Sequence, residues 1–209
     1  MNTTFFVGLD LGKKRDPAAV AVVERIDRVR AFQGTEFYRL GARHLERAPL
    51  GTPYPRLVER VRQIVQSGQL RGRCALAVDA TGVGEPVVDL LRAARLGCEL
   101  CAVTITSGEY QHSRGASEWS VPKRDLIAHV QVLLERNELR IARRMRDAGS
   151  LVRELLDMQS TTTNSGHRRL GADGHGQHDD LVIALALACW RARRPQIGLG
   201  QAPLPGVVW

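Results

Sequence analysis

The chain has 209 residues, 44% of them hydrophobic, which is enough for one large domain with a buried core. Its net charge of +8 is compatible with an acidic partner such as nucleic acid. Only three of its 30 basic residues are lysines, at positions 13, 14 and 123, so 27 are arginines. The preference for arginine over lysine is compatible with nucleic-acid binding, because arginine binds phosphate in a bidentate way. The codon usage of a GC-rich genome would produce the same preference.

No stretch of the sequence predicts membrane insertion or export. The longest apolar run, residues 181–190, is shorter than the roughly 20 residues that span a bilayer, and the N-terminus lacks a signal-peptide pattern. We therefore expect a cytosolic protein with reduced, buried thiols. Cys98 and Cys101 have the spacing of half a zinc site, but the sequence contains no second such pair.

The first 50 residues predict three strands. Residues 4–11 form a short apolar run, and residues 18–23 are apolar and β-branched, which predicts two antiparallel neighbours joined by a polar turn. Residues 28–40 alternate loosely between apolar and polar side chains, which predicts a third strand with Gly34 as a candidate bulge.

The middle of the chain predicts a strand–helix–strand unit behind an amphipathic helix. Apolar side chains from Leu57 to Val65 recur at three- and four-residue spacing, which is typical of a half-buried helix. Residues 74–79, 84–96 and 99–105 then predict a strand, a helix and a parallel strand with a right-handed crossover. Residues 107–121 are polar and contain two glycines, so we expect a loop over a binding surface.

The remaining segments predict helices on both faces of a mixed sheet, which is an α/β fold within residues 1–194. We expect a helix opened by proline at residues 122–137, a short edge strand at 139–142, a helix at 147–158, a hairpin at 160–176 and a helix at 178–194. Residues 195–209 are rich in Pro and Gly and predict a disordered tail.

Three distant segments each place an aspartate at the edge of an apolar element. Asp10 lies in the first strand, Asp79 ends the fourth, and Asp180 opens the last helix. A buried carboxylate costs several kcal/mol unless it is paired, and clustered carboxylates repel each other unless cations neutralise them. If the first and fourth strands are neighbours and the last helix packs beside the first, the three form a site for Mg²⁺ or Mn²⁺.

Two such ions about 3.5–4 Å apart form a centre that cleaves phosphodiester bonds. The sequence therefore predicts a metal-dependent phosphodiesterase with two Mg²⁺ or Mn²⁺ ions as cofactors. Asp10, Asp79 and Asp180 are the candidate catalytic ligands, and Asp179 is either a further ligand or a helix N-cap. His178 either shuttles protons or orients the loop before the helix.

Basic residues on the predicted loop and hairpin are candidates to hold DNA, although each is equally a solvated surface charge. They are Lys123, Arg124, Arg114, Arg168 and Arg169. Nothing in the sequence resembles a base-reading helix, so we expect cleavage that is nearly independent of DNA sequence.

The order of the motifs resembles the nuclease domain of phage terminase large subunits. The motifs are Val-Gly-Leu-Asp-Leu-Gly at residues 7–12, Val-Asp-Ala-Thr-Gly-Val-Gly at 78–84 and His-Asp-Asp-Leu-Val-Ile-Ala-Leu-Ala at 178–186, with weaker similarity at 121–126 and at Glu154. The resemblance spans about residues 5–190. It implies an RNase H-like fold, with Asp10, Asp79 and one of Asp179 and Asp180 as metal ligands. It also implies an endonuclease that cuts concatemeric double-stranded viral DNA during packaging.

One feature of complete large terminases is missing from this sequence. It has no Gly-x-x-x-x-Gly-Lys-Ser/Thr phosphate loop of an ATPase motor. The resemblance therefore implies a nuclease domain that works with a motor, a small terminase subunit and a portal. A Holliday-junction resolvase and a DNA-docking module without catalysis are the alternatives. Residues 8–12 also resemble a phosphate motif of sugar kinases and actin-like ATPases, which need roughly twice this length.

Overall fold

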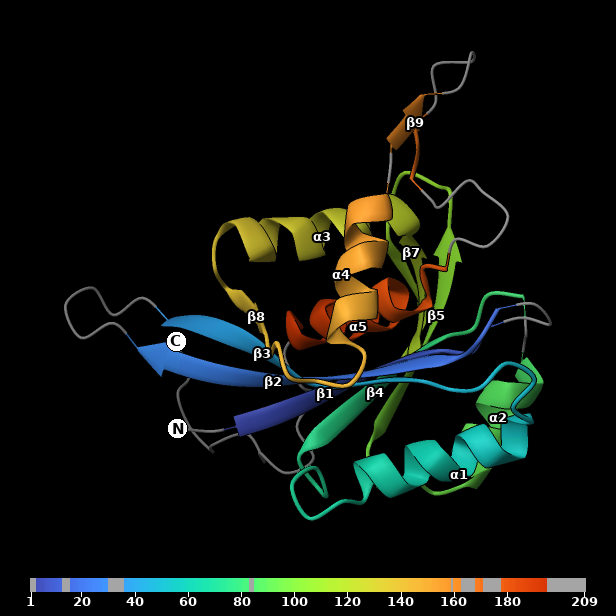
Figure 1. Cartoon of the computed structure of the whole chain (residues 1–209). Helices are drawn as coiled ribbons and strands as arrows, with labels where there is room; N and C mark the ends of the chain where they lie inside the picture. The colour runs from blue at the N-terminus through green and yellow to red at the C-terminus, as the bar shows by residue number, and fades with distance from the viewer. Residues whose placement is uncertain are drawn as a thin grey trace, which may run out of the picture.

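Strand β1 (Thr3–Asp10) lies inside an eight-stranded mixed sheet of order β6-β7-β5-β4-β1-β2-β3-β8. The computed structural model describes residues 3–12, 16–29, 36–82, 85–158, 160–162, 168–170 and 178–194. Figure 1 shows α1 and α2 on one face of the sheet and α3, α4 and α5 on the other. The predicted mixed sheet with helices on both faces is confirmed.

The sheet combines an antiparallel meander with a parallel half. Strand β1 pairs antiparallel with β2 (Ala19–Val29), which pairs antiparallel with β3 (Glu36–Arg47). On its other side β1 pairs parallel with β4 (Cys74–Asp79), followed by β5 (Glu99–Thr106) and β7 (Glu118–Pro122). The edges are β6 (His112–Gly115) and β8 (Leu139–Ile141).

The helices agree with the predicted segments within a few residues. They are α1 (Tyr54–Val65), α2 (Glu85–Ala93), α3 (Lys123–Glu135), α4 (Ala148–Asp157) and α5 (Asp180–Ala192). The predicted hairpin at residues 160–176 is represented by β9 (Ser160–Thr162) and β10 (Arg168–Leu170). The predicted bulge at Gly34 and the predicted tail at 195–209 lie outside the described residues. No helix of the described part is long and apolar enough to cross a membrane.

Strand β1 is apolar throughout because both of its faces are covered. Phe6 points into the core beneath α5, whereas Val7 and Leu9 point into the core beneath α1 and α2. All three side chains are buried. A strand buried on both faces is a continuous hydrophobic run rather than an alternating one, which explains why this stretch lacks the period of two.

Helix α5 packs directly on β1, and Gly8 makes this contact possible. Every residue of α5 is buried, as expected for a helix that is apolar on all sides. A Cβ atom on Gly8 would overlap the carbonyl oxygen of Ala184 and would lie 2.7 Å from the backbone nitrogen of Ala188. The helix can therefore approach the strand this closely only because residue 8 has no side chain.

Two of the predicted elements are wrong in detail. The segment 107–121, expected to be a loop, contains the β6–β7 hairpin at the edge of the sheet. Trp119 anchors it, because the Arg194 guanidinium lies 4.5 Å from the Trp119 ring and 3.7 Å from the Trp190 ring. The third strand begins at residue 36 and runs to residue 47, later than the predicted 28–40, because β2 continues to Val29.

Gly8→Ala should destabilise the protein, because the added methyl group meets the α5 backbone and no flexible side chain can give way. We expect the free energy of unfolding to fall by about 2–4 kcal/mol. Urea unfolding followed by circular dichroism measures it.

Gly149→Ala in α4 is the matched control, because a Cβ atom there meets nothing within 4 Å. This change should be neutral or stabilising by less than about 1 kcal/mol. Equal unfolding midpoints for the two variants would show that α5 does not depend on the missing side chain at residue 8.

Candidate active site

Asp10 and Asp79 end two neighbouring parallel strands. The last paired residues of β1 and β4 are Leu9 and Val78, and the two aspartates follow them directly. The backbone N–H of Gly12 donates to Asp10 Oδ1 at 3.0 Å, and that of Thr81 donates to Asp79 Oδ1 at 2.8 Å. Each carboxylate is thus oriented by the turn that follows its own strand. The sheet therefore places both side chains at one edge.

Asp180 reaches the same edge from the first turn of α5. It is only 3% exposed, and its charge acts on Asp10, since it contributes to the raised pKa of that residue. The packing of α5 on β1 brings it there. The predicted neighbours, β1 beside β4 and the last helix beside β1, are both present.

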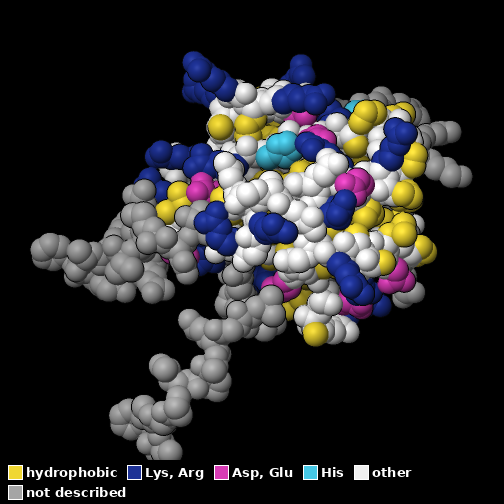
Figure 2. Space-filling view, turned by 90° about the horizontal axis from the view of Figure 1, so that it is seen from below, with side chains coloured by type: hydrophobic (Ala, Val, Ile, Leu, Met, Phe, Trp, Pro, Cys, Tyr) yellow, Lys and Arg dark blue, Asp and Glu magenta, His cyan; other side chains and the backbone are white. Residues whose placement is uncertain are grey.

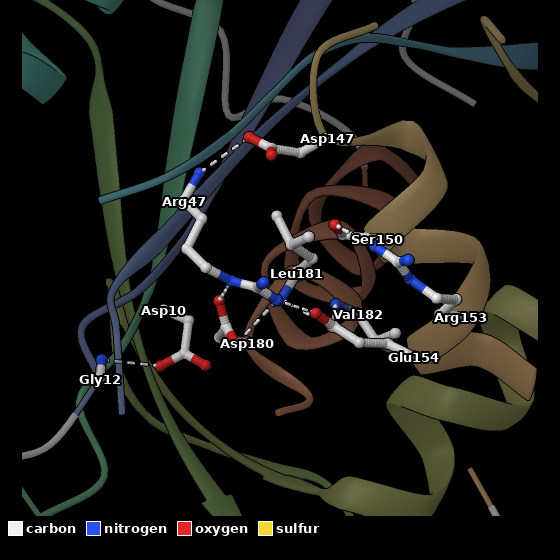
Figure 3. Close-up of polar contacts among 10 residues, drawn as sticks. All are labelled: Asp10, Gly12, Arg47, Asp147, Ser150, Arg153, Glu154, Asp180, Leu181 and Val182. Atoms are coloured by element: carbon white, nitrogen blue, oxygen red, sulfur yellow. Dashed lines mark hydrogen bonds and ion pairs between the residues drawn. The ribbon is translucent and has the colours of Figure 1, made fainter. Parts of the chain in front are cut away.

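Arg47, the last residue of β3, neutralises part of this acidic group. Its Nε donates to Asp180 Oδ2 at 2.7 Å and its Nη2 to Asp180 Oδ1 at 3.2 Å. The same Nη2 also donates to Oε1 of Glu154. Figure 3 shows the guanidinium lying between the two acidic side chains. A fork of this kind fixes the orientation of a carboxylate as well as its charge.

Glu154 of α4 caps the N-terminus of α5. Its Oε2 accepts hydrogen bonds from the backbone N–H groups of Leu181, at 3.1 Å, and Val182, at 3.2 Å. These are donors that a helix end leaves without an intrahelical partner. The side chain of Asp179, which occupies the N-cap position, makes no capping hydrogen bond. The sequence had offered Asp179 as the cap, and the structure gives that role to Glu154.

Burial and like charges raise the pKa of two of these carboxyl groups. Burial is the main reason that the pKa of Asp10 rises to about 8. The hydrogen bond from the Gly12 N–H opposes this rise, and the charges of Asp79, Asp179 and Asp180 add to it. The pKa of Glu154 rises to about 7 because burial, and after it the charge of Asp180, favour the protonated form. Arg47 and the two N–H donors lower this pKa but do not cancel the rise. Burial thus favours the protonated form of both groups, and the neighbouring carboxylates add to this effect.

The donor set fits divalent cations, although the side chains are held by basic partners. The charges of Asp79, Asp179 and Asp180 act on Asp10, and hard ions such as Mg²⁺ and Mn²⁺ prefer carboxylate ligands. Within the described ranges, no three His, Cys, Asp or Glu side chains are grouped so that they could hold a metal ion. In this arrangement Arg47 holds Asp180, and Lys123 Nζ lies 2.5 Å from Asp179 Oδ2.

The structure places the predicted DNA-contacting residues, and His178, at several separate positions. Lys123, the first residue of α3, lies at the carboxylates. Arg124 donates to the carbonyl oxygen of Glu109 at 2.9 Å. Arg114, on β6, and His178, before α5, are exposed. Arg168 and Arg169 are on β10, and their side chains lie outside the described part of the chain.

Sequence reasoning missed Arg47. The predicted third strand ended at residue 40, so Arg47 had no assigned place in the sheet. In the structure it pairs with Ala19, which in turn pairs with Asp10. The register of the meander therefore places Arg47 two strands away from Asp10, and this relation could not be seen before that register was known.

Three solved structures share this fold. The nuclease domain of the large terminase of Thermus phage P74-26 matches with a TM-score of 0.59 and 20% identity, covering 89% of this chain and 78% of that one. The manganese-bound nuclease domain of the large terminase of bacteriophage SPP1 matches with a TM-score of 0.54 and 14% identity, covering 90% of this chain and 86% of that one. A mutant nuclease domain of the large terminase of bacterial virus Sf6, with manganese, matches with a TM-score of 0.59 and 13% identity, covering 89% of this chain and 88% of that one.

No protein-family model and no curated protein matches the sequence. The structural matches confirm the predicted RNase H-like α/β fold and the resemblance, at the level of the fold, to terminase nuclease domains.

Arg47→Met should destabilise the protein strongly, because it leaves the buried Asp180 and Glu154 side by side without their shared cation. Breaking such a pair from one side typically costs about 3–5 kcal/mol. Urea unfolding in a metal-free buffer measures the loss.

Arg60→Met is the matched control, since Arg60 pairs with Glu46 at a more exposed position. Its cost should be about 1 kcal/mol or less. Combining Arg47→Met with Asp180→Asn should recover part of the lost stability. An Arg47 variant as stable as the Arg60 variant would contradict the role given to Arg47.

Proposed function

We propose that this chain is a metal-dependent endonuclease that hydrolyses phosphodiester bonds in double-stranded DNA. The observation that carries this proposal is the placement of Asp79, Asp179 and Asp180 around Asp10, at the carboxyl end of β1, where burial first and then the charges of these three carboxylates raise the pKa of Asp10 to about 8. Buried, clustered carboxylates are costly unless cations neutralise them. The clustering at the end of parallel strands is also where α/β sheets carry their sites.

Asp10, Asp79, Asp180 and Asp179 are the proposed ligands, for two Mg²⁺ or Mn²⁺ ions. Divalent ions bound there would supply Lewis-acid stabilisation of the phosphate and a more acidic water. The carboxylates would hold and orient the ions, and they would not attack the phosphate themselves. The Gly12 and Thr81 N–H groups fix the first two, and the Arg47 fork fixes Asp180. A cation bound there would compete with the proton that burial favours on Asp10.

The basic residues of the chain are proposed to hold the DNA backbone. Arg114 is exposed on β6, and Lys123 lies next to Asp179, where it can offset the charge of a phosphate that approaches the carboxylates. Arg124, Arg168 and Arg169 complete the proposed set. Phosphate contacts fix the position of DNA without reading its sequence, so nearly sequence-independent cleavage follows.

The biological setting that we propose is the packaging of phage DNA in the cytoplasm of a bacterial host. It is supported by the fold shared with three terminase nuclease domains and by the order of the motifs. In this setting the chain would cut concatemeric DNA and would work with a terminase ATPase motor, a small terminase subunit and a portal.

Asp10→Asn should abolish metal-dependent cleavage, because the amide keeps the shape of the side chain and removes the charge that attracts the cations. We expect the rate at which supercoiled plasmid is nicked, in Mn²⁺ or Mg²⁺, to fall about 100-fold or more. Agarose gel electrophoresis of timed samples measures the rate. Isothermal titration with Mn²⁺ should show a matching loss of binding.

Asp89→Asn is the control, since Asp89 is an exposed aspartate of α2 whose only described contact is with Arg92. It should cut at the wild-type rate. Wild-type protein that binds DNA and Mn²⁺ but cuts neither plasmid nor linear duplex would favour the DNA-docking alternative. Cleavage confined to four-way junctions would favour a resolvase.

A further inference from the structure

The connection between β8 and α4 carries a dense group of exposed arginines. We use the name arginine patch for Arg140 on β8 and for Arg143, Arg144 and Arg146 on the turn that follows. All four side chains are exposed. Within the described part of the chain, none of them makes a hydrogen bond or an ion pair. The patch therefore presents four guanidinium groups within seven residues, none of them in an ion pair with a described carboxylate.

The turn that carries the patch is held in place by apolar anchors and backbone hydrogen bonds. Ile141 and Met145 pack against the core beneath α5, so the arginines between and beside them face outward. The N–H of Met145 donates to the Ala142 carbonyl and that of Ala148 donates to the Met145 carbonyl, each at 3.2 Å. The arginines are thus presented from an ordered turn, which lowers the entropy cost of binding a partner.

Several other arginines of the described chain are paired with carboxylates. Arg60 and Arg62 of α1 pair with Glu46 and Glu59, and Arg92 of α2 pairs with Asp89 and Glu118. Figure 2 shows the face that carries α1 and α2, where acidic side chains lie among the basic ones. The patch differs because its nearest acidic neighbour in sequence, Asp147, is already bonded to the backbone N–H of Arg47.

That same bond places the patch beside the candidate active site. Asp147 Oδ2 lies 3.2 Å from the Arg47 nitrogen, and the Arg47 side chain extends from there to Asp180 (Figure 3). Arg146 precedes Asp147 in the chain, so this bond ties the turn that carries the patch to the end of β3, from which Arg47 reaches the carboxylates.

We propose that the arginine patch binds the phosphate backbone of duplex DNA next to the segment placed at the carboxylates. This inference rests on the proposed nuclease function. Arginine suits this role because its planar fork binds phosphate oxygens in a bidentate way and stays charged at any working pH. The patch presents no set of side chains shaped to read base edges, so it positions the duplex without choosing its sequence.

The test compares two triple variants with the same loss of charge. One carries Arg143→Gln, Arg144→Gln and Arg146→Gln in the patch. The other carries Arg→Gln changes at three exposed positions, 62, 71 and 95, on α1 and on the turns after α1 and α2. Binding to a fluorescent 30-base-pair duplex is measured by anisotropy in Ca²⁺ at several salt concentrations, with thermal melts to confirm folding.

The patch variant should bind at least about tenfold more weakly at 0.1 M salt, and the slope of log K against log salt should become shallower by about 2–3, as expected for the loss of three phosphate contacts. The control variant should keep the wild-type slope. A third variant with lysines at the three patch positions should recover most of the slope, because the charges remain.

Equal losses in the patch and control variants, or no loss in the patch variant, would overturn the proposal. Plasmid cleavage by the wild-type protein separates this failure from failure of the proposed function. If the wild type cuts DNA and the patch variant binds normally, the patch alone is misassigned. If the wild type neither binds nor cuts DNA, the nuclease proposal itself falls.

Discussion

The close approach of α5 to β1 is the constraint on which the rest of the structure depends. It requires a residue without a side chain at position 8, because the backbone of α5 at Ala184 and Ala188 occupies the place of a Cβ atom. It also requires a helix that is apolar on every side, because α5 lies between the sheet and the helices α3 and α4. This contact fixes where the first turn of α5 lies, and so it carries Asp180 to the end of β1. A helix even slightly farther from the sheet would leave Asp10 and Asp79 without the carboxylate that completes the group.

Placing a helix N-terminus in a buried position creates an electrostatic problem that the structure solves from two sides. The first N–H groups of α5 need acceptors, and Glu154 supplies them from α4. That carboxylate then lies beside Asp180, so a second acidic group has entered the interior. Arg47 compensates by contacting both, and it can do so because the β3 backbone ends in register with Ala19 and Asp10. The cap, the salt bridge and the strand register are therefore one arrangement, and each part loses its purpose without the others.

The sequence was most informative where a residue type conflicted with its surroundings. Lone aspartates in apolar runs identified Asp10, Asp79 and Asp180, and α1 and β4 followed from periodicity and from an apolar run with clear ends. Arg47 and the capping role of Glu154 were beyond sequence reasoning. The contacts of Arg47 join residues more than 100 positions apart through a strand register, and the capping by Glu154 depends on the packing of α4 beside α5, which no local pattern encodes. The β6–β7 hairpin was missed for a different reason. Its strands are short and polar, and the Trp119–Arg194–Trp190 stack that anchors it joins distant parts of the chain.

An acidic centre that must accept a polyanion has to overcome its own repulsion. Asp10 and the three carboxylates around it would keep a phosphodiester away, and bound cations would lessen this effect only at the centre itself. Under the proposed function, the surplus of arginine, which gives the chain its charge of +8, would act at longer range, because an attractive potential outside the site raises the local concentration of a polyanion before any close contact forms. The arrangement separates the two roles in space. Arg47, which is paired, shapes the site, whereas the unpaired arginines of the arginine patch face the solvent. In the function that we propose, it is these unpaired arginines, more than the total charge, that determine where a polyanion first binds.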